Sequence, residues 1–235
     1  TCDIATGADP DCDNDGVPNS CELFANDCDG DELPDDCELA TGGPDCNGNL
    51  VLDGCDIAGG ASLDANGDQV PDECEFLPYC FGDGTGSACP CANFGAAGRG
   101  CANSVNAAGA VLTVTGVPQI FGDTIVLHGA GMPNSVSPSA IYLQGTLRDN
   151  GGLGTPLNDG LRCVTGSLVR LGTKPNSGGA SQYPDVGNPS VSVRGAVPSG
   201  GGTYHYQVFY RNAAAAFCPP GTANWTNAIS IVWRP

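Results

Sequence analysis

The chain has 235 residues and a formal net charge of −18, with all eight Lys and Arg residues after position 98. Because 21 of the 26 acidic residues lie between Asp3 and Glu75, the first 76 residues carry −21 and the remainder +3. An acidic chain without a basic stripe argues against nucleic acid as a partner, and no segment approaches the roughly 20 apolar residues of a membrane span.

The acidic segment, residues 1–76, cannot collapse by itself, because like charges repel and little apolar surface is available to offset that repulsion. It must be disordered, or bound cations must neutralise it. The 14 cysteines, with only two histidines, favour disulfides in an oxidising compartment over a zinc protein. We therefore expect metal ions and disulfides to replace a conventional core in this segment.

Four twelve-residue loops recur in the acidic segment, starting at Asp11, Asp27, Asp45 and Asp64, at intervals of 16, 18 and 19 residues. Each loop has an oxygen-bearing side chain at positions 1, 3, 5, 9 and 12. Calcium takes six to eight oxygen ligands, and an EF-hand loop supplies them from these positions and from the carbonyl of position 7. The spacing therefore predicts about four calcium sites in tandem.

This array resembles the calcium repeats of dockerins and of thrombospondin type 3 domains, which are extracellular modules. The resemblance implies a ligand set for each loop, position by position. The first site is Asp11, Asp13, Asp15, the Val17 carbonyl, Asn19 and Glu22, and the second is Asp27, Asp29, Asp31, the Leu33 carbonyl, Asp35 and Glu38. The third is Asp45, Asn47, Asn49, the Val51 carbonyl, Asp53 and Asp56, and the fourth is Asp64, Asn66, Asp68, the Val70 carbonyl, Asp72 and Glu75.

The loops depart from the EF-hand pattern at position 6, where a glycine normally makes the sharp turn. The first loop has Gly16 there, but the others have Glu32, Leu50 and Gln69, with glycine at position 4 instead. This difference predicts a turn made in another way. The third loop also has two amides and the short Asp56, so we expect it to be the weakest site and the first two to be the tightest.

The cysteines of the array allow two pairing schemes. Pairing within loops joins 12–21, 28–37 and 46–55 and leaves Cys2 and Cys74 over. Pairing between successive repeats joins 2–12, 21–28, 37–46 and 55–74 and uses all eight cysteines, so we favour it.

Thr1, Cys2 and Asp3 match positions 10 to 12 of a loop whose first nine residues are absent, which predicts upstream sequence or a neighbouring subunit that completes this end.

Residues 77–104 form a connector rich in Gly and Cys. Two disulfides are expected among its cysteines, Cys80, Cys89, Cys91 and Cys101, which leaves Cys163 and Cys218 as a further pair. Asp83, Asn93 and Asn103 offer oxygens for another cation, but such residues in Gly-rich turns are more typical turn formers.

Residues 105–235 have short apolar runs separated by Gly, Pro and Asn, at 110–116, 123–131, 139–147, 161–172, 190–197, 203–212 and 227–235. Residues alternate between apolar and polar in 203–210 and 227–233, which is typical of half-buried strands. The fold class is therefore mainly β, with an antiparallel β-sandwich of jelly-roll or Ig-like type. The order of calcium loops, cysteine-rich connector and sandwich resembles that of secreted bacterial proteins without an assigned activity.

The residues do not indicate an enzyme. His128 and His205 are the only histidines, and we expect His205 on a solvated strand face. The sequence has no G-x-S-x-G motif, and its C-terminal domain has no Glu. Carboxylates for glycoside hydrolysis would have to come from Asp83, Asp123, Asp149, Asp159 or Asp185.

The leading hypothesis is a secreted, calcium-stabilised structural protein of the cell surface or matrix that assembles head to tail with copies of itself. The alternative is a module that binds surface glycan or a protein partner, and a dockerin-like plug fits less well. Aromatic residues available for sugar binding are Tyr142, Tyr183, Tyr204, Tyr206, Tyr210, Trp225 and Trp233, although we expect most of them to fill the core. Asn224–Trp225–Thr226 is also a glycosylation sequon.

Overall fold

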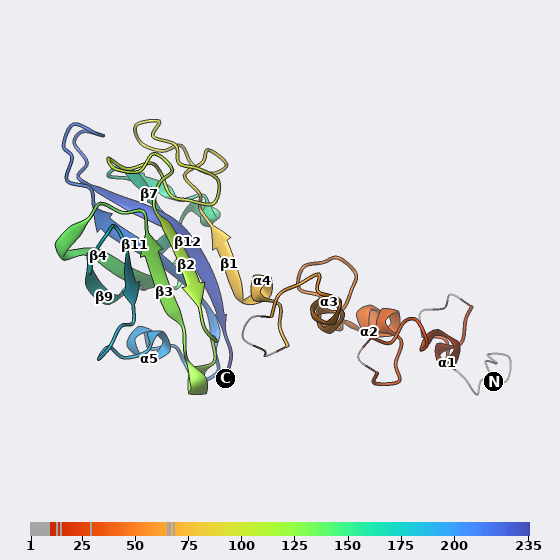
Figure 1. The fold of residues 1–235 in the computed structure, drawn as a ribbon. Helices are drawn as coiled ribbons and strands as arrows, with labels where there is room; N and C mark the ends of the chain where they lie inside the picture. The colour runs from red at the N-terminus through yellow and green to blue at the C-terminus, as the bar shows by residue number, and fades with distance from the viewer. Residues whose placement is uncertain (1–9, 13, 15, 29, 65–66, 68) are drawn as a thin grey trace. The chain divides into compact units, whose positions relative to one another are not determined.

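The computed structural model describes residues 10–235 except 13, 15, 29, 65, 66 and 68. The chain divides into two compact units, Thr1–Glu75 and Phe76–Pro235 (Figure 1). The first unit contains the four acidic loops, and the second contains all the strands. The connector over residues 77–104 belongs to the second unit.

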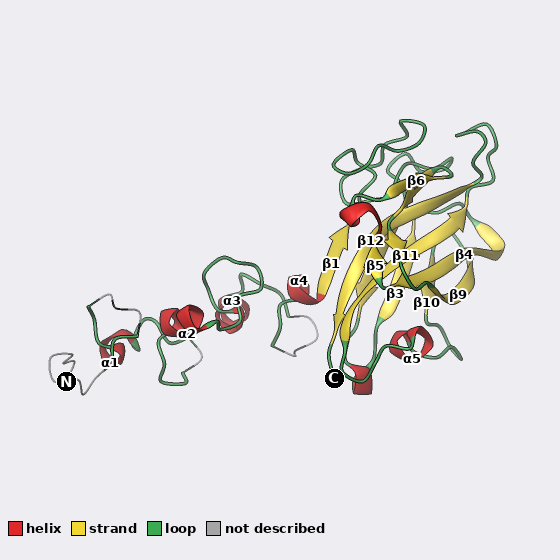
Figure 2. Cartoon of the chain, turned by 180° about the vertical axis from the view of Figure 1, so that it is seen from behind, coloured by secondary structure: helices red, strands yellow, loops and turns green. Residues whose placement is uncertain are grey.

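In the first unit each loop leads into a short helix (Figure 2). The helices are α1 (Asn19–Glu22), α2 (Asp35–Thr41), α3 (Asp53–Gly59) and α4 (Asp72–Glu75). Each begins at loop position 9, directly after a buried residue at position 8, which is Pro18, Pro34, Leu52 or Pro71. Helices α2 and α3 end at Gly42 and Gly60, whose left-handed conformation lets their N–H groups reach the last helical carbonyls.

Disulfides join successive loops of the first unit. The pairs are Cys12–Cys37, Cys28–Cys55 and Cys46–Cys74, with Cα–Cα distances of 5.5, 5.6 and 5.8 Å. Each connects position 2 of one loop to position 11 of the next, so both pairing schemes predicted from the sequence are wrong. Proximity along the chain is a poor guide here, because the short helix places position 11 beside the preceding loop. Cys21 is also disulfide-bonded. Thr1, Cys2 and Asp3, which match the last three positions of an incomplete loop, are among residues 1–9 and lie outside the described residues.

The second unit is mainly β and is built on two antiparallel sheets. The larger has the order β1-β12-β11-β4-β9, and the smaller has the order β10-β3-β2. The strands of the larger sheet are β1 (Phe76–Tyr79), β4 (Ser135–Gly145), β9 (Val169–Asn176), β11 (Gly202–Arg211) and β12 (Ala223–Trp233). Those of the smaller are β2 (Val111–Thr115), β3 (Val126–Ala130) and β10 (Ser181–Tyr183).

Two small two-stranded sheets and three short helical segments complete the second unit. One sheet pairs β5 (Leu147–Arg148) with β8 (Val164–Thr165), and the other is a hairpin of β6 (Thr155–Leu157) and β7 (Gly160–Arg162). The helical segments are 3-10 helices over Ile120–Gly122 and Asp149–Gly152 and helix α5 (Val191–Gly195). The longest helix of the described residues has seven residues, and none of these helices combines the length and hydrophobicity of a membrane span.

The two main sheets contribute to one hydrophobic core. Leu112 and Leu127 from the smaller sheet and Tyr142, Val208 and Ile231 from the larger one are all 1% exposed or less. The buried hydroxyls in this core have partners, as expected for polar groups removed from water. The Tyr142 hydroxyl accepts a hydrogen bond from the backbone N–H of Gly129 at 3.1 Å and thereby links the sheets.

Helix α5 occupies a segment, residues 190–197, for which the sequence predicts a strand, and that prediction is wrong. Val191 is buried in the core, and the Asp123 carboxylate accepts the backbone N–H of Ser192 at 2.7 Å in the first helical turn. The alternation of Ser and Val in residues 190–193 is too short to distinguish a strand from one turn of a helix with one buried face.

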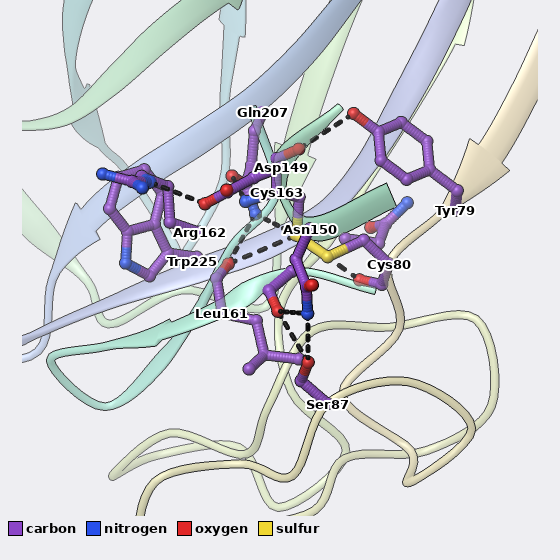
Figure 3. Close-up of a disulfide and its surroundings, with 12 residues drawn as sticks. Tyr79, Cys80, Ser87, Asp149, Asn150, Leu161, Arg162, Cys163, Gln207 and Trp225 are labelled. Atoms are coloured by element: carbon purple, nitrogen blue, oxygen red, sulfur yellow. Dashed lines mark hydrogen bonds and ion pairs between the residues drawn. A yellow bond between two sulfur atoms is a disulfide. The ribbon is translucent and has the colours of Figure 1, made fainter. Parts of the chain in front are cut away.

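Two of the three disulfides of the connector join it to later parts of the second unit, and one lies within the connector. Its disulfides are Cys80–Cys163, Cys89–Cys101 and Cys91–Cys218. The predicted pair Cys163–Cys218 is therefore wrong, and only one of the two disulfides expected within the connector forms. Around Cys163 (Figure 3), Gln207 accepts the Cys163 N–H at 2.8 Å and donates to the Leu161 carbonyl at 2.9 Å. Residues 77–79 belong to strand β1, and the rest of the connector covers part of one face of the larger sheet, where Gly100 and Ala102 lie against β12.

Candidate metal sites

The first residue of every loop is an aspartate around which the backbone turns. Asp27 accepts the N–H of Gly30 at 2.7 Å and that of Glu32 at 3.2 Å. The same two positions, 4 and 6, donate to Asp45 at 2.8 and 3.0 Å and to Asp64 at 2.7 and 2.9 Å. Asp11 accepts from Gly16 at 3.2 Å. The described parts of the four loops therefore share one turn geometry.

Position 6 has the same backbone conformation in all four loops. Its φ is 94° at Gly16, 73° at Glu32, 66° at Leu50 and 68° at Gln69. The expectation that the last three loops turn differently is therefore wrong. In each loop this left-handed conformation accompanies a position-6 N–H that donates to the position-1 carboxylate. Three loops adopt it without glycine, at a cost of about 1–2 kcal/mol per residue.

Position 9 closes each loop against its own start. Asn19 and Asp35 accept the N–H of the position-2 cysteine at 3.0 Å, and Asp53 does so at 2.9 Å. The backbone N–H of position 9 also donates to the carbonyl of the residue before the loop, at 2.7–2.8 Å in all four loops. A predicted ligand residue at position 9 is thereby held at the first turn of each helix.

In the third loop, positions 3, 5 and 12 meet at one point. The side-chain amides of Asn47 and Asn49 both donate to Oδ2 of Asp56, each at 2.8 Å. Asp56 is only 4% exposed. The side-chain amide of an asparagine can turn either its nitrogen, a donor, or its oxygen, an acceptor, toward a neighbouring group. Beside the Asp56 carboxylate, Asn47 and Asn49 turn their nitrogens toward it. The arrangement brings together three of the predicted calcium ligands of this loop.

Carboxylate oxygens at loop positions 1 and 12 are buried. Oδ1 of Asp11 is buried and has no hydrogen-bond partner among the described residues. At position 12, one oxygen each of Glu22, Glu38 and Glu75 is buried, and Glu75 as a whole is 0% exposed. The first 76 residues contain no Lys or Arg to neutralise these charges. Because a buried carboxylate needs a compensating charge, the loops fit a bound cation.

Five of the predicted ligands are not described, and most of the others lie in the loop backbone or at a helix start. Asp13, Asp15, Asp29, Asn66 and Asp68 lie outside the described residues. The residues predicted to offer carbonyls stand at position 7, directly before the buried position 8, and are Val17, Leu33, Val51 and Val70. Asp31 and Asn49 at position 5 accept the N–H of position 7 at 2.8 Å. Asp72, at position 9 of the fourth loop, begins α4.

Three groups of metal-ligating residue types also come together at the disulfides. They are Cys12, Asp36 and Cys37; Cys28, Asp35 and Cys55; and Cys46, Asp53 and Cys74, with ligand atoms within 4.8 Å of one another. All six cysteines are oxidised in disulfides, so they offer no thiolate to a metal. The carboxylates are the remaining ligands in these groups, which favours a cation that prefers oxygen.

In the second unit each histidine lies beside a hydroxyl group of a neighbouring strand. His205 is 8% exposed and contacts the Ser230 hydroxyl through Nδ1 at 2.8 Å, so the prediction of a solvated face is wrong. The connector and the β5–β8 region cover the face that alternation alone assigned to solvent. Burial, assisted by the nearby Arg148 guanidinium, lowers the pKa of His205 to about 4. His128 is half-buried beside the Thr115 hydroxyl, at 2.9 Å.

The five carboxylates of the second unit do not gather at one point and are each engaged locally. Asp149 pairs with Arg162 at 2.9 Å, and Asp185 pairs with Lys174. Asp159 is fully buried and accepts from the Asn212 amide at 2.7 Å, and burial raises its pKa. Asp123 accepts the N–H groups of residues 125 and 192, and Asp83 those of residues 85 and 98.

The residues considered for an extra cation in the connector serve as turn formers. Asp83 accepts the Thr85 hydroxyl at 2.6 Å, and this hydrogen bond lowers its pKa. Asn93 donates to the carbonyls of residues 102 and 159, and Asn103 donates to that of residue 131. Their side chains fasten the connector to the sheet.

The candidate sugar-binding aromatics lie almost entirely in the interior. Six of the seven are 8% exposed or less, and Tyr204 is half-buried. Asn224, the acceptor of the sequon, is fully buried; its amide nitrogen donates to the Ala102 carbonyl at 2.8 Å. The folded second unit therefore does not present this asparagine for modification.

The disulfides indicate an oxidising environment. Comparisons with models of protein families, with curated proteins and with solved structures find no match to this chain.

Proposed function

We propose that this chain is a secreted structural protein whose N-terminal unit is held together by calcium. The observation that carries the proposal is the set of buried position-1 and position-12 carboxylate oxygens in a segment without Lys or Arg. The resemblance to dockerin and thrombospondin type 3 repeats points to the same ion and to an extracellular setting. In this proposal the protein has no catalytic activity.

The ligands proposed for each ion are the oxygens of loop positions 1, 3, 5, 7, 9 and 12. Calcium, when bound, supplies the positive charge and the demand for many oxygens that such loops match. Asp45, Asn47, Asn49 and Asp56 show how one loop gathers these groups, since two amides and a carboxylate already meet at 2.8 Å. The cysteines, being oxidised, leave zinc without its preferred ligands.

The second unit, in this proposal, is a β-sandwich of jelly-roll or Ig-like type that serves as a rigid body for assembly. Support comes from the core residues that the five-stranded and three-stranded sheets share, among them Leu112, Leu127, Tyr142 and Ile231. We further propose that copies associate head to tail. The first 76 residues carry −21 and the remainder +3, so unlike parts of two copies attract each other. A contact of this kind that does not close propagates as a filament.

Ion counting tests the calcium sites. Native mass spectrometry of the full chain in calcium should show about four bound ions, each site binding one. Asp45→Asn should lose one ion. Asp83→Asn, the same chemical change in the second unit, should lose none. An unchanged count in Asp45→Asn, or no bound calcium in the unaltered chain, would contradict the proposed sites.

Electron microscopy and sedimentation of the purified chain, with calcium and with EDTA, test the assembly. Filaments or larger oligomers should form with calcium and disappear with the chelator. A strict monomer at high concentration in calcium would count against self-assembly while leaving the ion sites intact.

A further inference from the structure

One face of the five-stranded sheet is covered only in part. On β11, Gln207 lies beneath the cover, bonded to the Cys163 N–H and to the Leu161 carbonyl. Two residues further along the same face, Phe209 is half-buried, and Arg211, at the end of the strand, is exposed. The cover formed by the connector and the small two-stranded sheets therefore ends, on β11, between Gln207 and Phe209.

Beyond that edge, side chains from three adjacent strands form a row. Phe209 on β11 is paired directly with Ile141 on β4, and Ile141 is paired directly with Thr173 on β9. Directly paired residues share one face of a sheet, so the three side chains lie side by side. Ile141 is half-buried and Thr173 is exposed.

This row forms the floor of a hollow in the protein surface. Its rim contains Ser139, Arg211, Thr222 and Asn158, the last from the turn between β6 and β7. Hydroxyl, amide and guanidinium groups thus surround a small apolar floor. The backbone beneath the floor is already paired between neighbouring strands, so the hollow offers side chains and not a free strand edge.

The aromatic ring in the floor is held rigidly. Phe209 packs edge-to-face against Trp225, with 4.7 Å between ring centroids and an interplanar angle of 62°. Trp225 is itself anchored, because its Nε1 donates to the Leu157 carbonyl at 3.1 Å. A ring fixed in this way presents an apolar platform at little entropic cost to a ligand.

Two arginines on this face have no ion-pair partner among the described residues. The described residues form two ion pairs, which use Arg162 and Lys174, and neither Arg211 nor Arg170 takes part in one. Arg170 is exposed and is paired on β9 with Leu143, two residues from Ile141 along β4. The open part of the face therefore carries positive charge beside apolar side chains.

We propose that this hollow binds an acidic saccharide, a sugar chain that carries carboxylates. The apolar face of a sugar ring would lie on Phe209 and Ile141, and its hydroxyls would reach Ser139, Thr173 and Asn158. Arg211 would hold the carboxylate, because a guanidinium group matches a carboxylate with two parallel hydrogen bonds. A peptide that added a strand would need unpaired main-chain groups, which the floor does not offer.

Calorimetric titration of the full chain, in calcium, with a short soluble uronate oligosaccharide tests this site. Binding should be weakened at least tenfold, about 1.4 kcal/mol, by Arg211→Ala, and less by Arg211→Lys, which keeps the charge but loses the planar fork. Phe209→Ala and Arg170→Ala should also weaken it. Val193→Ser, at a 70% exposed position of α5 outside this face, is the matched control and should bind as the unaltered chain does.

Several results would overturn the proposal. Equal binding of a neutral oligosaccharide of the same length would remove the role of the arginines. Binding that survives Arg211→Ala together with Arg170→Ala would place the sugar elsewhere, for example on ions of the acidic loops. Loss of self-association in Arg211→Ala without any saccharide binding would assign the face to a second copy. The contribution of Phe209, Arg211 and Arg170 to saccharide binding does not depend on whether the loops bind calcium, so this site and the proposed function can fail separately.

Discussion

The two units of this chain hold their folds by different means. In the second, sixteen buried hydrophobic residues form one cluster shared by the two main sheets. Among the described residues of the first, Cys37 and Leu52 are the only buried hydrophobics besides the prolines, whereas Asp53, Asp56 and Glu75 are buried carboxylates. Apolar burial stabilises a fold without outside help, but buried carboxylates stabilise it only when a cation accompanies them.

The disulfides of the two units also differ in how far along the chain they reach. The three described disulfides of the first unit join neighbouring loops at sequence separations of 25 to 28 residues. Two of those in the second unit span 83 and 127 residues and fasten the connector to distant parts of the chain. The described disulfides of the first unit thus close the chain locally, whereas two of those in the second unit join segments far apart in the sequence. The comparison leads to four predictions.

The largest expected effect is that of chelation. With EDTA, the backbone amides bonded to Asp27 and Asp45 should lose their protection from hydrogen exchange, because the carboxylates then repel one another. Both tryptophans, Trp225 and Trp233, are in the second unit, so their fluorescence reports on that unit alone. Its unfolding midpoint should not change. Protection of the loops that persists in EDTA would contradict the proposed role of calcium.

Loss of a long-range disulfide should have the next largest effect. Replacing Cys80 and Cys163 together by alanine should lower the free energy of unfolding seen by tryptophan fluorescence by about 4 kcal/mol, because a long loop is no longer closed in the unfolded chain. The matched control replaces Cys46 and Cys74, whose disulfide lies in the first unit. That control should leave the tryptophan transition unchanged, and equal losses in both variants would show that the units unfold together.

Acid should weaken the second unit through His205. Because its pKa is about 4 when folded and near 6.5 when unfolded, the unfolded chain takes up the proton first as the pH falls. The stabilisation is complete above pH ~6.5 and is lost by about pH 4, a difference of about 3 kcal/mol. His205→Gln should flatten this part of the stability curve measured by tryptophan fluorescence, whereas His128→Gln should largely retain it. A wild-type slope in His205→Gln would contradict the assignment.

The smallest effect is expected at position 6 of the third loop. Leu50 is 78% exposed and has a φ of 66°, so Leu50→Gly should relieve backbone strain while losing little packing. About 1 kcal/mol of relief corresponds to roughly fivefold tighter calcium binding by that loop. Gly48→Ala should act in the opposite direction, since Gly48 has a φ of 72° and no atom lies within 4 Å of an added Cβ. Titration followed by NMR can compare the two; tighter binding in Gly48→Ala would refute the strain argument.

Features that depend on local spacing could be predicted from the residues alone. The oxygen-bearing residues at loop positions 1, 9 and 12 could be predicted because a turn is made within a few residues, and the structure gathers Asn47, Asn49 and Asp56 as the spacing suggests. The mainly β character of the second unit followed from alternation in 203–210 and 227–233, where β11 and β12 lie.

Contacts between distant segments could not be predicted in this way. Cys163 pairs with Cys80 and not with Cys218, and His205 is buried because the connector covers its strand face. The same cover leaves Phe209 and Arg211 beyond its edge, beside a hollow that no sequence pattern predicted. The physical reason is that alternation says which residues share a face of a strand, whereas what covers that face depends on contacts between segments far apart in the chain.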